Sequence, residues 1–548
     1  MRPLTVSLAL TAAFASASAV PRAANQSPTV QAPAGTITGS LIDSVEYFRG
    51  IPYAEPPVGN LRLRGPVRAQ PQSVIQATGV GPACPQMTNS VVTPLLGQAI
   101  SDPEVAGPLF LGSAFDNGQE DCLTISVMRP ENTPADAKLP VLFWMHGGGF
   151  AIGSSQAYNG SVIITRAAQQ GKPFILVAVN YRLGAFGFLG GAEVLAENST
   201  NLGLLDQRMG LEWIADNIAS FGGDPDAVTI SGESAGSISV FDQMALYNGD
   251  NTYGGRPLFR GAIMHSGSIQ TREPVDGPSA QKVFDTVVAA ANCSSETDKL
   301  ECLRNADYDT FWQASMSVPS FLSNSSIALS YTPRQDGKIL TDSTDVLAKQ
   351  GRFAQVPMII GDVKDEGTIF SLFPVGIANQ DELVSYLSSF IYKHASRKEI
   401  TTLLNTYPTG GDNNTYAGFT QLAGMLGDAF FTMKRRELLD YLPAKVPAWS
   451  FLGNWLPDTP IVKTFHTSDV PRLFYYTDST SKSIQDRYFS FITSANPNDG
   501  DKTLPYWPSW HKSRQSLEFG ANEATIIPDN FRKKSYEFIK SHKAAFQL

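Results

Sequence analysis

The sequence predicts an α/β fold in which one large, mostly parallel sheet is flanked by helices, and two observations predict it. Strand-like and helix-like patterns alternate along most of the 548 residues without a polar linker, as expected where helices connect parallel strands. Two apolar strands, expected over 141–145 and 226–232, each end in a glycine-containing turn, and a helix is expected over 237–246. Although the chain is longer than a usual domain, we expect residues 20–548 to form one domain.

The second of these turns, Gly232-Glu233-Ser234-Ala235-Gly236, matches G-x-S-x-G. This motif exposes a nucleophilic serine on a sharp turn between a strand and a helix. The glycines are needed because backbone segments approach too closely for a Cβ, and the serine takes a strained conformation. A motif this short also occurs by chance, so the neighbouring segments decide its meaning. Glu233, which precedes the serine, is expected to be buried and to support the site rather than react.

The first turn, His146-Gly147-Gly148-Gly149, matches the glycine loop that supplies backbone N–H groups to an oxyanion hole in α/β-hydrolases. The residue after the nucleophile supplies a further N–H group. A plain turn after a strand is the alternative. A dinucleotide-binding loop is excluded because Ile152 stands where G-x-G-x-x-G needs its third glycine.

A nucleophilic serine needs a general base, and in α/β-hydrolases the base follows the acid in the chain. His265 ends an apolar strand and could point into the site, but it comes too early for this order. His394 and His542 lie in charged segments, and His511 lies in a polar stretch. His466 lies in a polar loop after an apolar run, which is where a catalytic histidine is expected.

The acid is expected in the loop that follows an apolar strand over 356–361, because catalytic groups gather at the carboxyl ends of strands in α/β sheets. Glu366 lies in this loop, and Asp362 and Asp365 are its rivals. Composition alone leaves all three open.

These motifs and the segments around them resemble the type-B carboxylesterase/lipase family, which includes cholinesterases, bile-salt-activated lipase and secreted fungal lipases. The matching segments run along most of the chain: 48–59, 120–125, 180–189, 201–208, 221–225 and 365–368. The resemblance implies an α/β-hydrolase fold, a catalytic triad of Ser234, Glu366 and His466, and oxyanion donors at Gly148, Gly149 and Ala235. The family places its acidic Glu in an E-G-T context, which favours Glu366. The loop at His466 departs from the commoner F-H-G-x-D pattern at Thr467, but His466 and Asp469 are kept.

The four cysteines allow three pairings. Pairing Cys84 with Cys122 and Cys293 with Cys302 resembles the secreted fungal lipase and sterol-esterase branch, in which the first loop carries a mobile lid. Here the loop, about 85–121, is rich in apolar residues and contains no Lys or Arg, which suits a cover for water-insoluble esters. The alternative is a loop packed into the core. The loop between Cys84 and Cys122 also contains no Trp. Cholinesterases place a choline-binding Trp in this region, so its absence counts against a choline ester substrate.

The first 19 residues have the pattern of an export signal, with Arg2, an apolar stretch and a small-residue site at Ala17-Ser18-Ala19. No later run is long and apolar enough to span a bilayer. We therefore expect a secreted, extracellular protein. In such a protein four N-x-S/T sites are glycosylation candidates: Asn159, Asn198, Asn324 and Asn413.

The formal net charge is −9, which disfavours nucleic acid as a partner, and no metal-binding or nucleotide motif occurs, so we expect no cofactor. The sequence thus predicts a secreted serine ester hydrolase, of the lipase or sterol-esterase type, acting on hydrophobic long-chain esters at a lipid–water interface. A general carboxylesterase for short soluble esters is the alternative. A serine carboxypeptidase-like enzyme is less favoured because Ala235 stands where its motif carries Tyr, and a non-catalytic adhesion protein is disfavoured by the intact triad.

Overall fold

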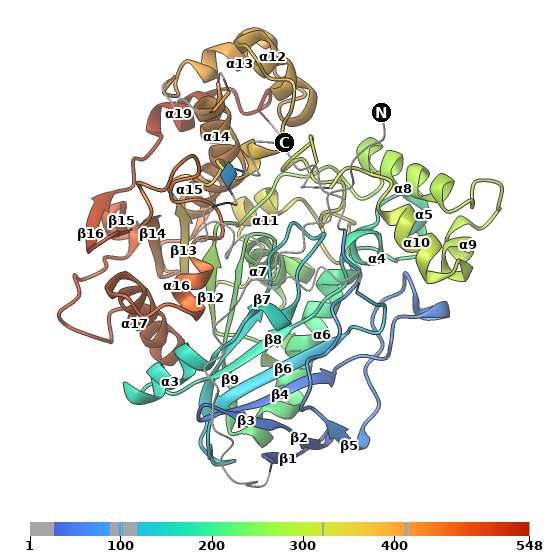
Figure 1. Ribbon diagram of the computed structural model, residues 1–548, viewed down its shortest axis with the longest axis vertical. Helices are drawn as coiled ribbons and strands as arrows, with labels where there is room; N and C mark the ends of the chain where they lie inside the picture. The colour runs from blue at the N-terminus through green and yellow to red at the C-terminus, as the bar shows by residue number, and fades with distance from the viewer. Residues whose placement is uncertain are drawn as a thin grey trace.

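The computed structural model describes residues 27–87, 98, 99, 101, 118–320, 323–409, 415, 416 and 418–546. Within them an eleven-stranded sheet crosses the molecule in the order β16-β15-β14-β13-β12-β9-β7-β8-β6-β4-β3 (Figure 1). The strands are β3 (Ser40–Ile42), β4 (Val45–Pro52), β6 (Thr124–Pro130), β7 (Leu139–Met145), β8 (Ile175–Val179), β9 (Gly223–Glu233), β12 (Gly261–His265), β13 (Met358–Val363), β14 (Ala448–Asn454), β15 (Gln515–Gly520) and β16 (Ala524–Pro528). A smaller sheet joins β1 (Thr29–Ala32), β2 (Gly35–Thr38) and β5 (Gln72–Gln76).

The middle of the large sheet, from β8 to β15, is entirely parallel, whereas its two edges are antiparallel. Central strands such as β8, with the sequence ILVAV, are buried along their whole length. Continuous apolar strands are expected where helices cover both faces of a parallel sheet. The predicted mostly parallel α/β sheet is therefore confirmed.

Helices cover both faces, and the side chains of β7 alternate between two cores. Val141, Phe143 and Met145 join the core on the face of α6 (Leu202–Asn217) and α7 (Ala235–Ala245). Leu142 and Trp144 join the opposite core, with α3 (Ser161–Gln169), α16 (Val470–Phe474) and α17 (Ser479–Ser494). This alternation follows from the two-residue period of a strand.

A third, helical core lies at one end of the sheet, at the top of Figure 1. Its helices are α12 (Gln380–Tyr386), α13 (Arg397–Leu404), α14 (Phe419–Gly427) and α19 (Lys533–Ser541), and its chain continues through a π turn, η7 (Asp428–Thr432), into α15 (Met433–Tyr441). Phe370 and Phe465, from the loops after β13 and β14, pack in this core. The helical core therefore holds the loops that carry the predicted acid and base.

Two disulfides join Cys84 to Cys122 and Cys293 to Cys302, the pairing that the resemblance implies. Most of the expected lid, 88–97, 100 and 102–117, lies outside the described residues, as do the expected signal peptide and Asn413. Asn159 and Asn198 are exposed, whereas Asn324 is half-buried and its side-chain oxygen accepts a hydrogen bond from Val375 N–H at 2.8 Å.

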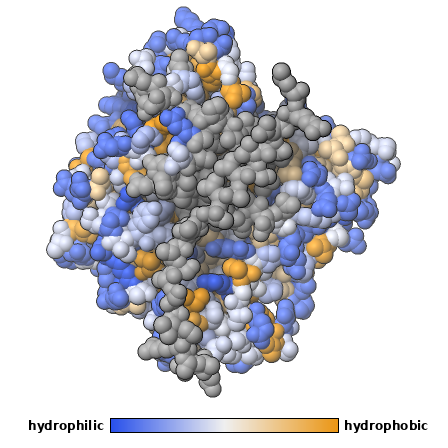
Figure 2. All heavy atoms as spheres, viewed as in Figure 1, coloured by the Kyte–Doolittle hydropathy of each residue, from blue (hydrophilic) through white to orange (hydrophobic). Residues whose placement is uncertain are grey.

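The face of the molecule seen in Figure 2, in the same view as Figure 1, is mainly hydrophilic. Among its described atoms, apolar residues form small separate patches. Among the helices that the structure describes, none is both long and apolar enough to cross a bilayer.

Candidate active site

Ser234 stands on a strained turn between β9 and α7. Its φ and ψ are 57° and −123°, a conformation that persists only where the surrounding structure imposes it. A Cβ at Gly236 would lie 2.0 Å from the carbonyl oxygen of Met145, and one at Gly232 would lie 2.5 Å from the carbonyl carbon of Gly236. Both motif glycines are thus required by close backbone approach. The Ser234 N–H donates to the carbonyl oxygen of His265 at 2.9 Å, which anchors the turn to β12.

The glycine loop after β7 lies against this turn. A Cβ at Gly147 would lie 3.1 Å from the Ser234 Cβ. Gly148 and Gly149 have φ of +106° and +62°, values that favour glycine. Among the described residues, the N–H groups of Gly148, Gly149 and Ala235 donate to no backbone or side-chain acceptor. N–H groups that have no acceptor within the described part of the chain, one following Ser234 and two in the adjoining glycine loop, are what an oxyanion hole requires.

His466 and Glu366 form a buried pair. The Nδ1 of His466 lies 2.6 Å from Oε2 of Glu366, and the other carboxylate oxygen accepts a hydrogen bond from Val363 N–H at 2.8 Å. The rings of Phe370 and Phe431 lie 5.0 and 4.6 Å from the imidazole, centroid to centroid. The ring is therefore oriented by one carboxylate and shielded from water by two aromatic side chains.

The E-G-T segment holds the acid loop in place. A Cβ at Gly367 would lie 1.9 Å from the carbonyl oxygen of Ala423, so the glycine allows α14 to pack on this loop. The Thr368 hydroxyl lies 2.7 Å from the carbonyl oxygen of Val462, in the chain that leads to His466. Gly367 and Thr368 thus connect the loop of Glu366 to α14 and to the chain that leads to His466.

The two rival acids have structural partners. Asp365 joins the acid loop to the base loop, because its N–H donates to the carbonyl oxygen of Thr464 at 3.0 Å and its carboxylate accepts from Thr464 N–H at 3.3 Å. Asp362 accepts a hydrogen bond from Arg435 Nε at 2.7 Å. Neither carboxylate makes a hydrogen bond or ion pair with His466, so of the three candidates Glu366 is the one that is paired with this histidine.

The free nitrogen of His466, Nε2, lies 3.3 Å from Oε1 of Glu233 and makes no hydrogen bond among the described residues. The half-buried Ser234 follows Glu233 directly, and no hydrogen bond joins its hydroxyl to His466 in this structure. Burial lowers the pKa of His466, but the carboxylates of Glu233 and Glu366 raise it by more, so the net direction is upward. Burial raises the pKa of Glu233, although His466 opposes this.

A second buried histidine lies close by. His265 Nδ1 lies 2.8 Å from Oδ2 of Asp469, and its ring packs against Trp144, Phe451 and Tyr488 on the α17 face of the sheet. Sequence reasoning placed His265 near the site but missed its partner. The only available signal was that Asp469 follows His466 by three residues. The remaining candidates lie elsewhere, His394 and His542 being exposed and His511 half-buried.

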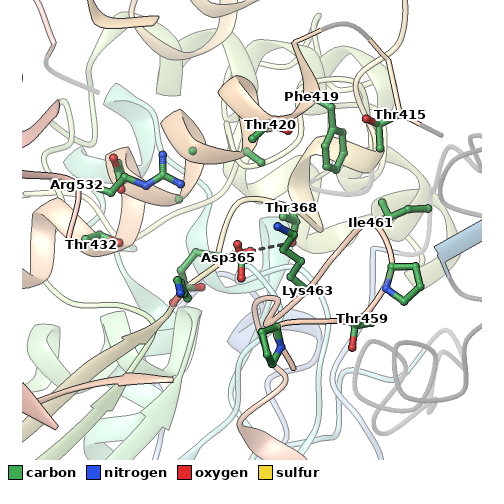
Figure 3. Close-up of a pocket in the computed structure, with 18 of the residues that line it drawn as sticks. Asp365, Thr368, Thr415, Phe419, Thr420, Thr432, Thr459, Ile461, Lys463 and Arg532 are labelled. Carbon is green, nitrogen blue, oxygen red and sulfur yellow. Dashed lines mark hydrogen bonds between the residues drawn. The ribbon is translucent and has the colours of Figure 1, made fainter. Parts of the chain in front are cut away.

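Figure 3 shows a cavity of about 510 Å³ beside the acid loop. Asp365 and Thr368 line it together with Lys463 and Arg532, and Glu366 contributes to its wall, whereas Ser234 and His466 are not among its lining residues. This cavity therefore adjoins Glu366 and its supports rather than Ser234 and His466.

A serine on a strained elbow, three free N–H groups and a buried carboxylate–imidazole pair are the parts of an acyl-transfer site. On this sheet they define a hydrolase of the α/β-hydrolase class. Comparison with known proteins gives the family. The model of the carboxylesterase family matches residues 26–539, and the chain therefore belongs to the carboxylesterase family and is a carboxylic ester hydrolase.

Individual relatives agree with this assignment. The chain is 47% identical over 540 residues to a secreted triacylglycerol lipase of Gibberella zeae, covering 94% of this chain and 90% of that protein. It is 41% identical over 532 residues to lipase 4 of Diutina rugosa, covering 93% and 95%. The crystal structure of EstA from Aspergillus niger superposes with a TM-score of 0.80 at 27% identity, covering 95% and 99%.

Proposed function

We propose that this protein is a secreted lipase that hydrolyses hydrophobic long-chain carboxylic esters through an acyl-enzyme. The observation that carries the proposal is the buried His466–Glu366 pair, at 2.6 Å, in the same site as the Ser234 elbow. The relatives named as secreted lipases support both the substrate class and secretion. Two disulfides also support secretion, because disulfides persist in oxidising compartments.

In the proposed mechanism Ser234 Oγ attacks the ester carbonyl while His466 Nε2 takes its proton. Glu366 fixes the proton-bearing Nδ1 of the imidazole and stabilises its charged form. The imidazolium then protonates the leaving alcohol. In the second half, His466 takes a proton from water as its oxygen attacks the acyl-enzyme, and the imidazolium then returns this proton to Ser234 Oγ as the ester bond to the serine breaks and the carboxylic acid leaves.

The N–H groups of Gly148, Gly149 and Ala235 are proposed to receive the oxyanion in both tetrahedral intermediates. They are held by backbone geometry and need no rearrangement when charge develops. A single donor of this kind lowers the barrier by about 3–4 kcal/mol.

The disulfide-closed loop is proposed to be a lid over this site. Its first residues are attached to the oxyanion loop, because Met87 N–H donates to the carbonyl oxygen of Ala151 at 2.9 Å and the Gln86 side chain exchanges two hydrogen bonds with Gly153. Its last residues return to the same place, since Gln119 N–H donates to the carbonyl oxygen of Ala83 at 3.0 Å. Both ends of the loop therefore start beside the proposed oxyanion hole.

The decisive experiment measures kcat/KM for p-nitrophenyl esters from acetate to palmitate, and for emulsified triacylglycerol and a steryl ester, with Ser234→Ala as the blank. A lipase prefers the long-chain and emulsified substrates. Hydrolysis of short soluble esters alone would leave a general carboxylesterase, and cleavage of a C-terminal amino acid from a peptide would favour the carboxypeptidase alternative.

A further inference from the structure

A second cavity, of about 360 Å³, opens between α15, α19 and α11 (Thr344–Gln350). None of the proposed catalytic or oxyanion residues lines it. Its lining is apolar in part and basic in part, and it consists of Thr271, Lys349, Tyr392, Ala429, Met433, Lys434, Glu437, Asp440, Tyr441, Tyr536, Ile539, Lys540, Lys543 and Phe546.

One part of the lining is apolar. Ala429, Met433 and Phe546 are buried side chains, and Ile539 on α19 is half-buried. The aromatic rings of the lining tyrosines extend this surface. A concave apolar surface of this size suits a hydrocarbon chain rather than a sugar or a nucleotide.

The other part carries more positive than negative charge. Four lysines line the cavity, and two carboxylates face them. Lys434 and Lys543 share Glu437, and although burial raises the pKa of this carboxyl, the two lysines lower it to about 2. Lys543 also lies 4.0 Å from Asp345, which is outside the lining.

Two lysines remain available to a ligand. Lys540 lies 3.5 Å from Asp440 and is 64% exposed. Lys349 is exposed and makes no ion pair within the described part of the chain. Their ammonium groups can therefore turn toward an anion at the edge of the cavity without breaking a buried ion pair.

A buried polar group in the lining has no hydrogen-bond partner among the described residues. Tyr392 is 1% exposed, and its hydroxyl makes no hydrogen bond to any residue that the structure describes. An unpaired buried hydroxyl is unfavourable, and a bound polar group or water would satisfy it.

We propose that this cavity binds the carboxylate of a single-chain fatty acid, with the hydrocarbon chain on the apolar surface and the head group at Lys349 and Lys540. Recognition follows from the pairing of an apolar surface with a cationic edge, which fits an anionic amphiphile and disfavours a cationic one. The choice of a fatty acid, the expected product of hydrolysis, rests on the proposed function.

The site shares a structural element with the catalytic residues. Ala429 lines the cavity from the π turn and Met433 lines it from the first residue of α15, whereas Phe431 between them packs on the ring of His466. Product bound here would therefore contact the same turn that shields the base.

The test is isothermal titration of dodecanoate, below its micelle concentration, into the full-length protein with Ser234 blocked by a serine-directed phosphonate. One site should remain after blocking. Its affinity should fall about four-fold for each methylene removed from the chain, and dodecyltrimethylammonium should not compete. The double variant Lys349→Gln, Lys540→Gln should weaken binding on the order of three- to ten-fold, and Ile539→Trp, which fills the cavity, should abolish it.

Lys534→Gln is the matched control, because this exposed lysine lies on the same helix outside the cavity. Three outcomes would each overturn the proposal. They are loss of all binding when Ser234 is blocked, equal binding of the cationic amphiphile, and unchanged affinity in both the lysine and the Ile539 variants. Because binding is measured without turnover, a failure of the lipase proposal can be distinguished from a failure of the fatty-acid site. If Ser234 resists the phosphonate, Ile539→Trp should still remove one site from the untreated protein.

Discussion

His466 Nδ1 lies 2.6 Å from Glu366 Oε2, although the two residues are 100 positions apart in the chain. The contact is made by two loops that follow the carboxyl ends of the neighbouring parallel strands β13 and β14. Asp365 and Thr368 then tie the loops together. The geometry of the proposed base thus depends on groups that take no part in proton transfer.

Removal of any proposed triad member should abolish most of the activity. Ser234→Ala and His466→Ala should each lower kcat by about 10⁶-fold, and Glu366→Gln by about 10⁴-fold, because the three groups act as one unit. Steady-state kinetics on a p-nitrophenyl ester checks this, with circular dichroism to verify folding. Ser237→Ala is the matched control, since that hydroxyl donates to the carbonyl oxygen of Gly267. Substantial turnover by folded Ser234→Ala would refute the assignment.

The dependence of kcat/KM on pH should report the environment of His466. The imidazole must be neutral to accept the serine proton. Although burial lowers its pKa, Glu233 and Glu366 raise it above the ordinary value of about 6.5. Activity should therefore be lost, as pH falls, at a higher pH than for an unperturbed histidine.

Glu233→Gln tests the cause of this shift. Removing the carboxylate 3.3 Å from Nε2 should lower the pKa of His466 and move the acid limb to lower pH. Each midpoint belongs to the interacting groups together rather than to one residue. An unchanged limb in Glu233→Gln would show that Glu233 does not raise the pKa of His466, and a wild-type profile that stays flat down to about pH 4 would show that another group is the base.

The Arg435 network should be a major contributor to stability. This fully buried guanidinium bonds Asp362 at 2.7 Å and Asp529 at 2.8 Å. Arg435→Leu leaves the buried carboxylate of Asp362 without its cation and leaves Asp529 with Arg436 as its remaining cation, which should cost about 3–5 kcal/mol of the free energy of unfolding. Arg397→Leu, which breaks the exposed pair with Asp381, should cost about 0–1 kcal/mol. Urea unfolding at pH 7 measures both, and equal losses would contradict the prediction.

The same network predicts a pH dependence of stability. Burial raises the pKa of Asp529, but Arg435 and Arg436 lower it by more, to well below its ordinary value. A carboxyl with a depressed folded-state pKa stabilises the protein above its unfolded pKa of about 3.9, and this stabilisation is lost as pH falls below it. The gap in stability between wild type and Arg435→Leu should therefore narrow in acid, and a constant gap down to about pH 2 would argue against it.

The loop between Cys84 and Cys122 should matter most for insoluble substrates. Leu109 and Phe110 lie in its apolar part, and an apolar patch opened to water is unfavourable unless lipid covers it. The double variant Leu109→Ser, Phe110→Ser should therefore lose far more activity on emulsified long-chain or steryl esters than on short soluble esters.

The control for the loop is Leu41→Ser, Ile42→Ser, which changes two apolar residues exposed on β3 and should leave both activities unchanged. Equal loss on both substrate classes in the loop variant would show that the loop packs structurally instead of opening at an interface.

Some features of the site were predictable from short segments because backbone geometry alone demands them. Gly232 and Gly236 are required because any Cβ at these positions would lie 2.0–2.5 Å from backbone atoms. The turn at Ser234 could therefore be predicted from a motif of five residues. The strand before the glycine loop was expected over 141–145 and is observed at Leu139–Met145. The helix expected over 237–246 is observed at Ala235–Ala245, beginning directly after Ser234.

What the sequence by itself determined was therefore the α/β class, the order of its chemical motifs and, by resemblance, the carboxylesterase family. The resemblance favoured Glu366 among three neighbouring carboxyl groups, whereas composition left Asp362, Asp365 and Glu366 open. Only the tertiary structure supplied the contact of Glu366 with His466 and the packing partners of the other two. It also paired His265 with Asp469, 204 positions apart, and assembled a lysine-edged cavity from α11, α15 and α19. Such contacts depend on which elements become neighbours in space, and the physical reason they escape prediction is that no local backbone constraint encodes them.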